Sequence, residues 1–105
     1  MKTLAILGST GSIGESALKV VNEFPEKFRV KALAAGLRAD RALEQAKLLG
    51  AEIVAVAREE DAKRLRGELP GVEVLHGEDG LLRVATAEGV QMVLSSIVGA
   101  AGLKP

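Results

Sequence analysis

Three glycines near the start of the chain have the type and spacing that can hold a diphosphate. Gly8, Gly11 and Gly14 stand three residues apart, after the apolar run Leu4–Leu7. A diphosphate binds to backbone N–H groups at the start of a helix, and side chains there would block its approach. We expect Gly8 to make the turn and Gly11 to admit the pyrophosphate. Gly14 would let the helix pack on the strand.

The residues between these glycines add hydrogen-bond donors. Thr10 and Ser12 supply hydroxyl groups, and a helical pattern begins at Ser12. The spacing is GxxGxxG rather than the commoner GxGxxG, and a glycine motif alone is weak. A glycine-rich turn without a ligand is the alternative interpretation. The strand, turn and helix around the motif favour a dinucleotide site.

The end of the second predicted strand bears on which dinucleotide binds. NAD enzymes usually carry an acidic residue there, about 20 residues beyond the glycines, to accept from the ribose 2′-OH. The segment Ala34–Arg38 has no acid, and we interpret Asp40 as a helix cap. Arg38 offers a planar fork of donors that suits a 2′-phosphate, although it could instead be a solvated loop charge. NADPH is therefore favoured over NADH.

Composition narrows the class of protein. Fourteen basic and 14 acidic residues give no net charge, which argues against a nucleic-acid partner. There is no cysteine, and no apolar run is long enough for a transmembrane helix. Hydrophobic residues make up 48% and aromatic residues only 2%, which suits an aliphatic core around a buried parallel sheet. We expect a cytoplasmic protein with no membrane partner.

Hydrophobic periodicity predicts alternating strands and helices. The expected strands are 3–7, 28–35, 53–57, 72–76 and 90–94, and the expected helices are 12–23, 41–49, 59–69 and 77–87. This alternation predicts one α/β domain, a Rossmann-type doubly wound parallel sheet in a three-layer αβα arrangement. Right-handed crossovers suggest the strand order 3-2-1-4-5. The ligand would then lie at the carboxyl ends of strands one, two, four and five.

Helical spacing also predicts which side chains face the sheet. In the first helix we expect the inward face to consist of Ile13, Ala17, Val20, Val21 and Phe24. In the second helix Ala42, Ala46 and Leu49 share a face, and in the third helix Ala62, Leu65 and Leu69 face inward. The fourth helix is weaker and carries Leu81, Leu82 and Ala85. The run 59–61 is interpreted as a solvated face, with ion pairs from Glu59 to Lys63 and from Glu60 to Arg64.

Residues that could catalyse substrate chemistry are not apparent. His76, the single histidine, ends a short predicted strand and has no partner in the sequence pattern, so we interpret it as structural or exposed. No acidic pair has metal-ligand spacing on a ligand-facing loop, and no nucleophile has a base. We therefore assign no catalytic residue and no metal ligand.

Four stretches of the sequence resemble the 1-deoxy-D-xylulose 5-phosphate reductoisomerase family. They are residues 1–14, 25–30, 34–36 and 96–105, so the resemblance runs from end to end. It implies an enzyme that isomerises this sugar phosphate and reduces the product with NADPH to 2-C-methyl-D-erythritol 4-phosphate. The reaction belongs to non-mevalonate isoprenoid biosynthesis. A divalent metal, magnesium or manganese, and a homodimer are also implied.

The resemblance transfers the family's NADPH contacts to named positions. They fall on Thr10, Gly11, Ser12, Ile13, Gly36, Leu37 and Arg38, with the nicotinamide half near Gly99 and Ala100. The family often has Lys-Asn where this chain has Leu37-Arg38. Leu37 cannot contact a phosphate ionically, so Arg38 would have to do so.

The family's chains are several times longer than these 105 residues. Its Lys-Glu-Ser stretch, metal carboxylates and substrate lid have no counterpart here. We therefore expect residues 1–105 to be an N-terminal NADPH-binding domain that does not turn over substrate alone. Alternatives are the dinucleotide-binding half of another NAD(P)-dependent reductase and a nucleotide-sensing module. A Tyr-x-x-x-Lys motif would favour a short-chain reductase, but the chain has no tyrosine.

Overall fold

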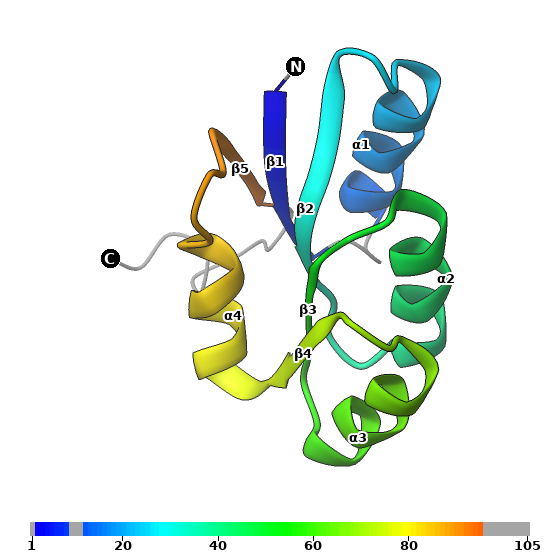
Figure 1. Cartoon of the computed structure of the whole chain (residues 1–105), viewed down its shortest axis with the longest axis vertical. Coiled ribbons are helices and arrows are strands. Elements are labelled where there is room, and N and C mark those ends of the chain that lie inside the picture. The colour runs from blue at the N-terminus through cyan, green and yellow to red at the C-terminus, as the bar shows by residue number, and fades with distance from the viewer. Residues whose placement is uncertain (1, 9–11, 96–105) are drawn as a thin grey trace.

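A five-stranded parallel sheet with helices on both faces organises the chain (Figure 1). The computed structural model describes residues 2–8 and 12–95, and only the backbone of residues 12, 13 and 95. The strands are β1 (Lys2–Leu7), β2 (Phe28–Ala34), β3 (Ile53–Val56), β4 (Glu73–His76) and β5 (Met92–Ser95). The helices are α1 (Ser12–Glu23), α2 (Ala39–Leu49), α3 (Glu59–Glu68) and α4 (Gly77–Ala85). The α/β class and the predicted alternation are confirmed.

The order of the strands differs from the prediction. It is β4-β3-β2-β1-β5, and every neighbouring pair is parallel. The predicted order 3-2-1-4-5 is wrong, because the fourth strand continues outward beside β3 and the fifth lies beside β1. Right-handed crossovers fix the hand of each connection, but not the strand after which the chain reverses its direction across the sheet. Here the reversal follows β4.

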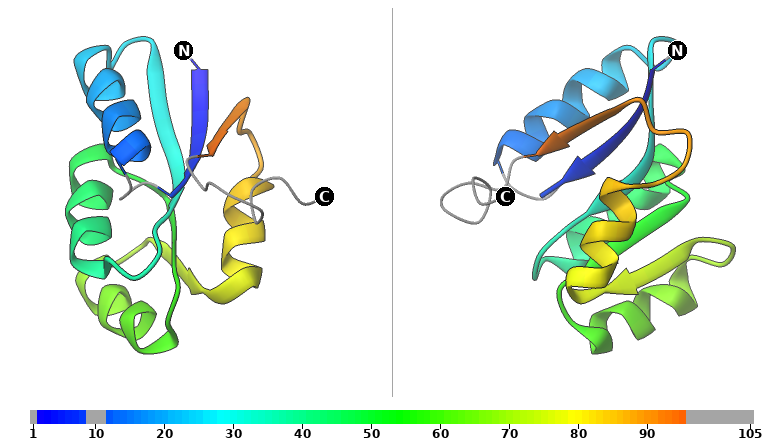
Figure 2. Two further views of the ribbon diagram at one scale, coloured as in Figure 1. Left: turned by 180° about the vertical axis from the view of Figure 1, so that it is seen from behind. Right: turned by 90° about the vertical axis from the view of Figure 1, so that its left-hand side faces the viewer.

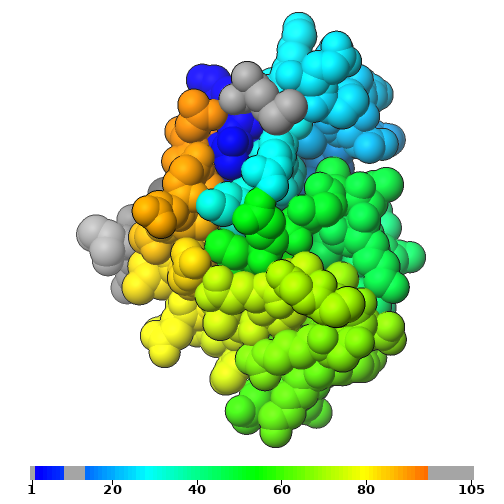
Figure 3. All heavy atoms as spheres, viewed as in Figure 1, coloured from blue at the N-terminus to red at the C-terminus, as the bar shows by residue number. Residues whose placement is uncertain are grey.

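The helices form two layers around the sheet, as the three-layer prediction requires. Helices α1, α2 and α3 cover one face, and α4 covers the other (Figures 1 and 2). The space-filling view shows the same division, with α2 and α3 in green on one flank and α4 in yellow on the other (Figure 3). Among residues 12–95, no helix has the length and apolar character needed to cross a membrane.

The core is aliphatic and lies on both faces of the sheet. Toward α1–α3 the sheet presents large side chains such as Leu4, Ile6 and Leu33, each at most 2% exposed. Toward α4 it presents small ones, Ala5, Ala32, Ala34 and Ala55 among them. These small residues let α4 pack close to the sheet.

The inward face of α1 is rotated from the one predicted. Gly14, Leu18 and Val21 are buried, a spacing of four and then three residues, which is one helical face. Val20 and Phe24, predicted to face inward, are 49% and 43% exposed. The sequence analysis missed Leu18, because several apolar residues in this helix fit more than one face.

The other helices bear out part of the prediction. In α2 and α3 the expected residues Ala42, Ala46, Ala62 and Leu65 are buried. In α4 the buried residues are Gly80 and Val84, and Leu82 is 62% exposed.

Candidate functional site

The carboxyl ends of the parallel strands lie at one edge of the sheet, and several of the predicted site residues follow them directly. Gly8 follows β1, and the loop 35–38 follows β2. Open α/β sheets bind ligands in the crevice outside these strand ends. Because β3, and not β4, lies beside β2, the loop 57–58 after β3 joins this edge. The residues directly after β4, Gly77 and Glu78, reach this edge as well, as expected of the fourth strand, although β4 is the outermost strand.

Gly8 has the backbone conformation expected of the turn after β1. Its φ is +79°, in the left-handed region that favours glycine. Its N–H donates to the carbonyl oxygen of Ala34 at 2.7 Å. This hydrogen bond holds the turn against the end of β2, the strand whose loop carries Gly36 and Arg38.

The rest of the glycine motif is described only in part. Gly14 is buried in α1, as expected of a glycine that brings a helix close to a strand. Thr10, Gly11, Gly99 and Ala100 lie outside the described residues, and so do the side chains of Ser12 and Ile13. Their roles remain predictions.

A mainly apolar groove of about 410 Å³ opens at the ends of β1, β2 and β3. Small residues dominate its wall, including Gly8, Ala34, Gly36, Ala55 and Ala57, and the start of α4 adds Gly77, Glu78 and Leu81. A Cβ added at Gly36 would meet no atom within 4 Å. The groove therefore leaves room at the strand ends for a flat, largely apolar group.

A second, polar groove of about 410 Å³ lies around the loops that follow β2 and β3. Four arginines are among the described residues that line it: Arg38, Arg41, Arg58 and Arg64. Acidic side chains line it as well, and most of these arginines pair with one of them. Such pairing decides which guanidinium groups are available to an anion.

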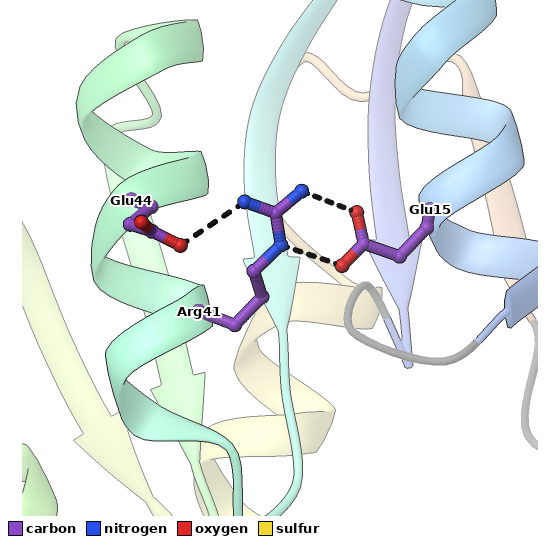
Figure 4. Close-up of polar contacts among 3 residues, drawn as sticks. All are labelled: Glu15, Arg41 and Glu44. Carbon is purple, nitrogen blue, oxygen red and sulfur yellow. Dashed lines mark hydrogen bonds and ion pairs between the residues drawn. The ribbon is translucent and has the colours of Figure 1, made fainter.

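Arg41 forms ion pairs with two glutamates, Glu15 and Glu44 (Figure 4). Its Nε donates to Glu15 at 2.6 Å, a terminal nitrogen donates to the other oxygen of Glu15 at 2.8 Å, and the second terminal nitrogen donates to Glu44 at 3.0 Å. The Arg41 hydrogen bond holds the pKa of Glu15 below its usual range, and the Glu15 carboxylate raises the pKa of Arg41. Arg41 thereby neutralises Glu15, the carboxylate in the first turn of α1.

Arg38 is exposed and differs from Arg41 in its partners. Its side chain forms no hydrogen bond or ion pair with any residue in the described ranges. Its charge acts on Glu15 only as the smallest of the causes that lower that pKa. Leu37 beside it is 68% exposed. Of the two residues that follow Gly36, Arg38 alone has a charge that an anion could meet.

Two acidic residues have roles other than those predicted. Asp40 does not cap α2, because the helix begins at Ala39 and the capping position is held by Arg38. Asp40 instead accepts a hydrogen bond from Arg64 at 2.7 Å. Asp61 is only 8% exposed and accepts from Arg58 at 3.2 Å, so it is not part of a solvated face.

The ion pairs predicted along α3 are also corrected. Glu59 forms none with Lys63, and Glu60 forms none with Arg64, among the pairs of the described chain. Arg64 reaches across to α2 instead. A partner on a neighbouring helix could not be read from spacing within one helix.

Sequence reasoning missed Arg58 because it left β3 out of the site. One local signal could have found Arg58. It stands directly before α3 as Arg38 stands directly before α2. His76 ends β4 and is exposed. No group of three metal-binding side chains gathers within residues 2–8 and 12–95.

Known proteins resemble this chain in sequence and in fold. A family model described as 1-deoxy-D-xylulose 5-phosphate reductoisomerase matches residues 4–105. A protein of that name from Geotalea uraniireducens is 49% identical over 107 residues, which cover 100% of this chain and 28% of the relative. The chain thus spans just over a quarter of the length of the curated relatives it matches.

Solved structures give the same picture. A DOX-P reductoisomerase in complex with NADPH, fosmidomycin and magnesium has a TM-score of 0.89 and 34% identity, over 98% of this chain and 26% of that one. The reductoisomerase from Zymomonas mobilis in complex with NADPH has a TM-score of 0.87 and 31% identity, over 98% and 27% of the two chains.

Proposed function

The chain belongs to the 1-deoxy-D-xylulose 5-phosphate reductoisomerase family, and we propose that residues 1–105 are the NADPH-binding domain of such an enzyme. The complete enzyme would isomerise 1-deoxy-D-xylulose 5-phosphate and reduce the product to 2-C-methyl-D-erythritol 4-phosphate, a step of isoprenoid biosynthesis. One observation carries the proposal for this domain. Arg38, which has no side-chain partner within residues 2–8 and 12–95, lies with a groove walled by small residues at the carboxyl edge of the sheet.

The described residues fit NADPH part by part. The apolar groove beside Gly36 suits the adenine ring, and Arg38 suits the 2′-phosphate of the adenosine ribose. The start of α1, with residues 10–13, would hold the diphosphate. The loop with Gly99 and Ala100 would lie near the nicotinamide. When bound, NADPH supplies the hydride, and this chain's residues bind and orient it.

The described residues do not fit a divalent metal. Magnesium is named for related structures, but no cluster of acidic and histidine side chains forms in the described ranges. The sugar-phosphate substrate, a homodimer and a cytoplasmic location are proposed on the family resemblance. Exposed apolar residues such as Val20 and Phe24 are compatible with a dimer.

Gly36 allows a test that separates binding from folding. We expect Gly36→Val to weaken NADPH binding at least tenfold in isothermal titration, because the new side chain would project into the groove. The fold should tolerate it, since a Cβ at Gly36 meets nothing within 4 Å and its φ is not positive. The thermal unfolding temperature of this variant should therefore stay close to that of the wild type.

Gly67→Val serves as the matched control. Gly67 lies in α3, is exposed, and likewise has no atom within 4 Å of an added Cβ. It does not line the groove, so NADPH affinity should be unchanged. A folded Gly36→Val variant that binds NADPH as tightly as the control would refute the proposed cofactor site.

A further inference from the structure

We propose that Arg58, at the end of β3, contacts the 2′-phosphate of NADPH together with Arg38 and so helps to select NADPH over NADH. This inference rests on the proposed function, since it concerns the same cofactor. It assigns a specificity role to a residue that follows β3.

Backbone hydrogen bonds bring the two loops together. The N–H of Ala35 donates to Ala55 at 2.8 Å, and the N–H of Ala57 donates to the carbonyl oxygen of Gly36 at 3.1 Å. The pairing of β2 with β3 therefore continues as far as Gly36 and Ala57. Arg58 is the next residue after this last hydrogen bond, and Arg38 follows Gly36 by two.

The two side chains line the same polar groove. Arg38 and Arg58 also hold equivalent positions, each at the N-terminal boundary of the helix that follows its strand. Neither side chain caps its helix. Both guanidinium groups are thus placed at the groove by the strand ends, and neither is used to cap a helix.

Pairing leaves both terminal nitrogens of Arg58 available, unlike those of Arg41 and Arg64. Arg41 uses all three nitrogens on Glu15 and Glu44, and Arg64 uses one of its two terminal nitrogens on Asp40. Arg58 uses only Nε, on Asp61 at 3.2 Å. Within the described chain its two terminal nitrogens have no partner, and its side chain is 55% exposed.

Asp61 orients Arg58 for such a contact. The carboxylate is largely buried, with 12% of its side chain exposed, so it holds the Nε edge of the guanidinium in place. The free edge is a fork that matches phosphate oxygens in two parallel hydrogen bonds. A phosphate monoester carries between about 1.5 and 2 negative charges at pH 7. One arginine does not neutralise it, and two do.

The test compares Arg58→Gln with Arg64→Gln. Both substitutions remove one positive charge from the same groove, so they change the long-range electrostatics alike. Glutamine can still donate to Asp61 in place of Arg58. The affinities to measure by isothermal titration are those for NADPH and NADH, and for adenosine 2′,5′-bisphosphate and adenosine 5′-monophosphate. Each pair of ligands differs by the 2′-phosphate.

We expect Arg58→Gln to lower the affinities for NADPH and for the bisphosphate about tenfold. The affinities for NADH and for the monophosphate should fall less than twofold. Arg64→Gln should change all four affinities less than twofold. Equal losses of NADPH and NADH in Arg58→Gln, or equal effects of the two substitutions, would overturn the role of Arg58 while leaving NADPH binding in place. Failure of the wild type to bind either dinucleotide would overturn the proposed function and this inference with it.

A further variant, Arg58→Lys, keeps the proposal testable if Arg58→Gln does not fold. If Arg58→Gln loses its cooperative thermal unfolding, Arg58→Lys keeps a cation beside Asp61 but lacks the planar fork. It should bind NADPH with an affinity between those of the wild type and a variant without the contact, and NADH as the wild type does. Wild-type affinity for NADPH in this variant would refute the bidentate contact.

Discussion

Four arginines around the polar groove carry the same charge but have different partners. Arg41 and Arg64 pair with acidic side chains of α1 and α2. Arg58 pairs with Asp61 through Nε alone, and Arg38 is unpaired in the described structure. A guanidinium that already has a carboxylate partner would have to lose it to bind a phosphate. Arg38 has no such partner to lose, and it is therefore the residue we expect to contribute most to selection of the 2′-phosphate.

Substitution of Arg38 should separate the two nicotinamide dinucleotides. We expect Arg38→Ala to weaken the binding free energy of NADPH by about 1.5–3 kcal/mol, the range for a hydrogen bond to a charged group. NADH lacks the 2′-phosphate, so its binding free energy should change much less. Titration calorimetry on both cofactors gives the comparison directly.

Lys47→Ala is the control for loss of charge. Lys47 is exposed in the last turn of α2, at the far end of the helix from Arg38. Its removal should leave both affinities unchanged. Should Arg38→Ala weaken NADPH and NADH to the same extent, Arg38 would not contact the 2′-phosphate.

At the scale of elements, the Glu15–Arg41 pair connects the first two helices beside the expected cofactor site. Glu15 lies in the first turn of α1 and Arg41 in the first turn of α2 (Figure 4). An unpaired carboxylate at the start of α1 would repel a diphosphate bound there. The pair thus has two consequences, since it ties α1 to α2 and removes a negative charge from the site.

The pair makes a prediction about acid stability. Because Arg41 lowers the pKa of folded Glu15, the carboxylate stabilises the fold above its unfolded pKa of about 4.3. This stabilisation is lost as the pH falls through the lowered pKa of the folded state. Denaturant unfolding should therefore show Glu15→Gln less stable than the wild type at pH 7, with the difference disappearing near pH 2.

Glu26→Gln is the matched control for this measurement. Glu26 is exposed in the turn before β2 and forms no ion pair among the described residues. Its substitution should change stability by the same small amount at both pH values. A Glu15→Gln difference that stays constant from pH 7 to pH 2 would contradict a stabilising ion pair.

For the whole molecule, α4 is the helix that closes the second face of the sheet. It carries the chain from β4 at one edge to β5 beside β1, and it crosses the small residues of the central strands. Its closest approach is at Gly80. A Cβ there would lie 3.0 Å from the Cβ of Leu75 and 3.2 Å from that of Ala55. These atoms adjoin the backbone, so the neighbours cannot move aside easily.

Two glycine substitutions in helices should therefore have opposite effects on stability. Gly80→Ala should destabilise the fold by about 1 kcal/mol, because overpacking outweighs the gain in helix propensity. Gly67→Ala, in open space on α3, should stabilise it by roughly 0.4–1 kcal/mol. Urea unfolding at neutral pH measures both. Stabilisation by both substitutions would mean that α4 does not pack against β3 and β4 as closely as described.

Local features of the sequence determined much of this structure. The periodicities predicted every strand and helix to within two residues at each boundary, because they depend on neighbours in the chain. The turn at Gly8 followed from a glycine between a strand and a helix, and its positive φ agrees. The class of fold followed from the alternation of elements. Arg38 was found because it lies at a fixed distance from the glycines.

Only the tertiary structure decided which distant segments share the site. The sequence pattern does not show after which strand the chain reverses its direction across the sheet, so β3 and Arg58 were left out of the site. The inward face of α1 depends on how the helix packs against the sheet. That packing buries Leu18 and leaves Val20 exposed. Arg41 pairs with a residue 26 positions away. Such pairings arise from packing between elements, where an ion pair forms with whichever charged group the fold brings near.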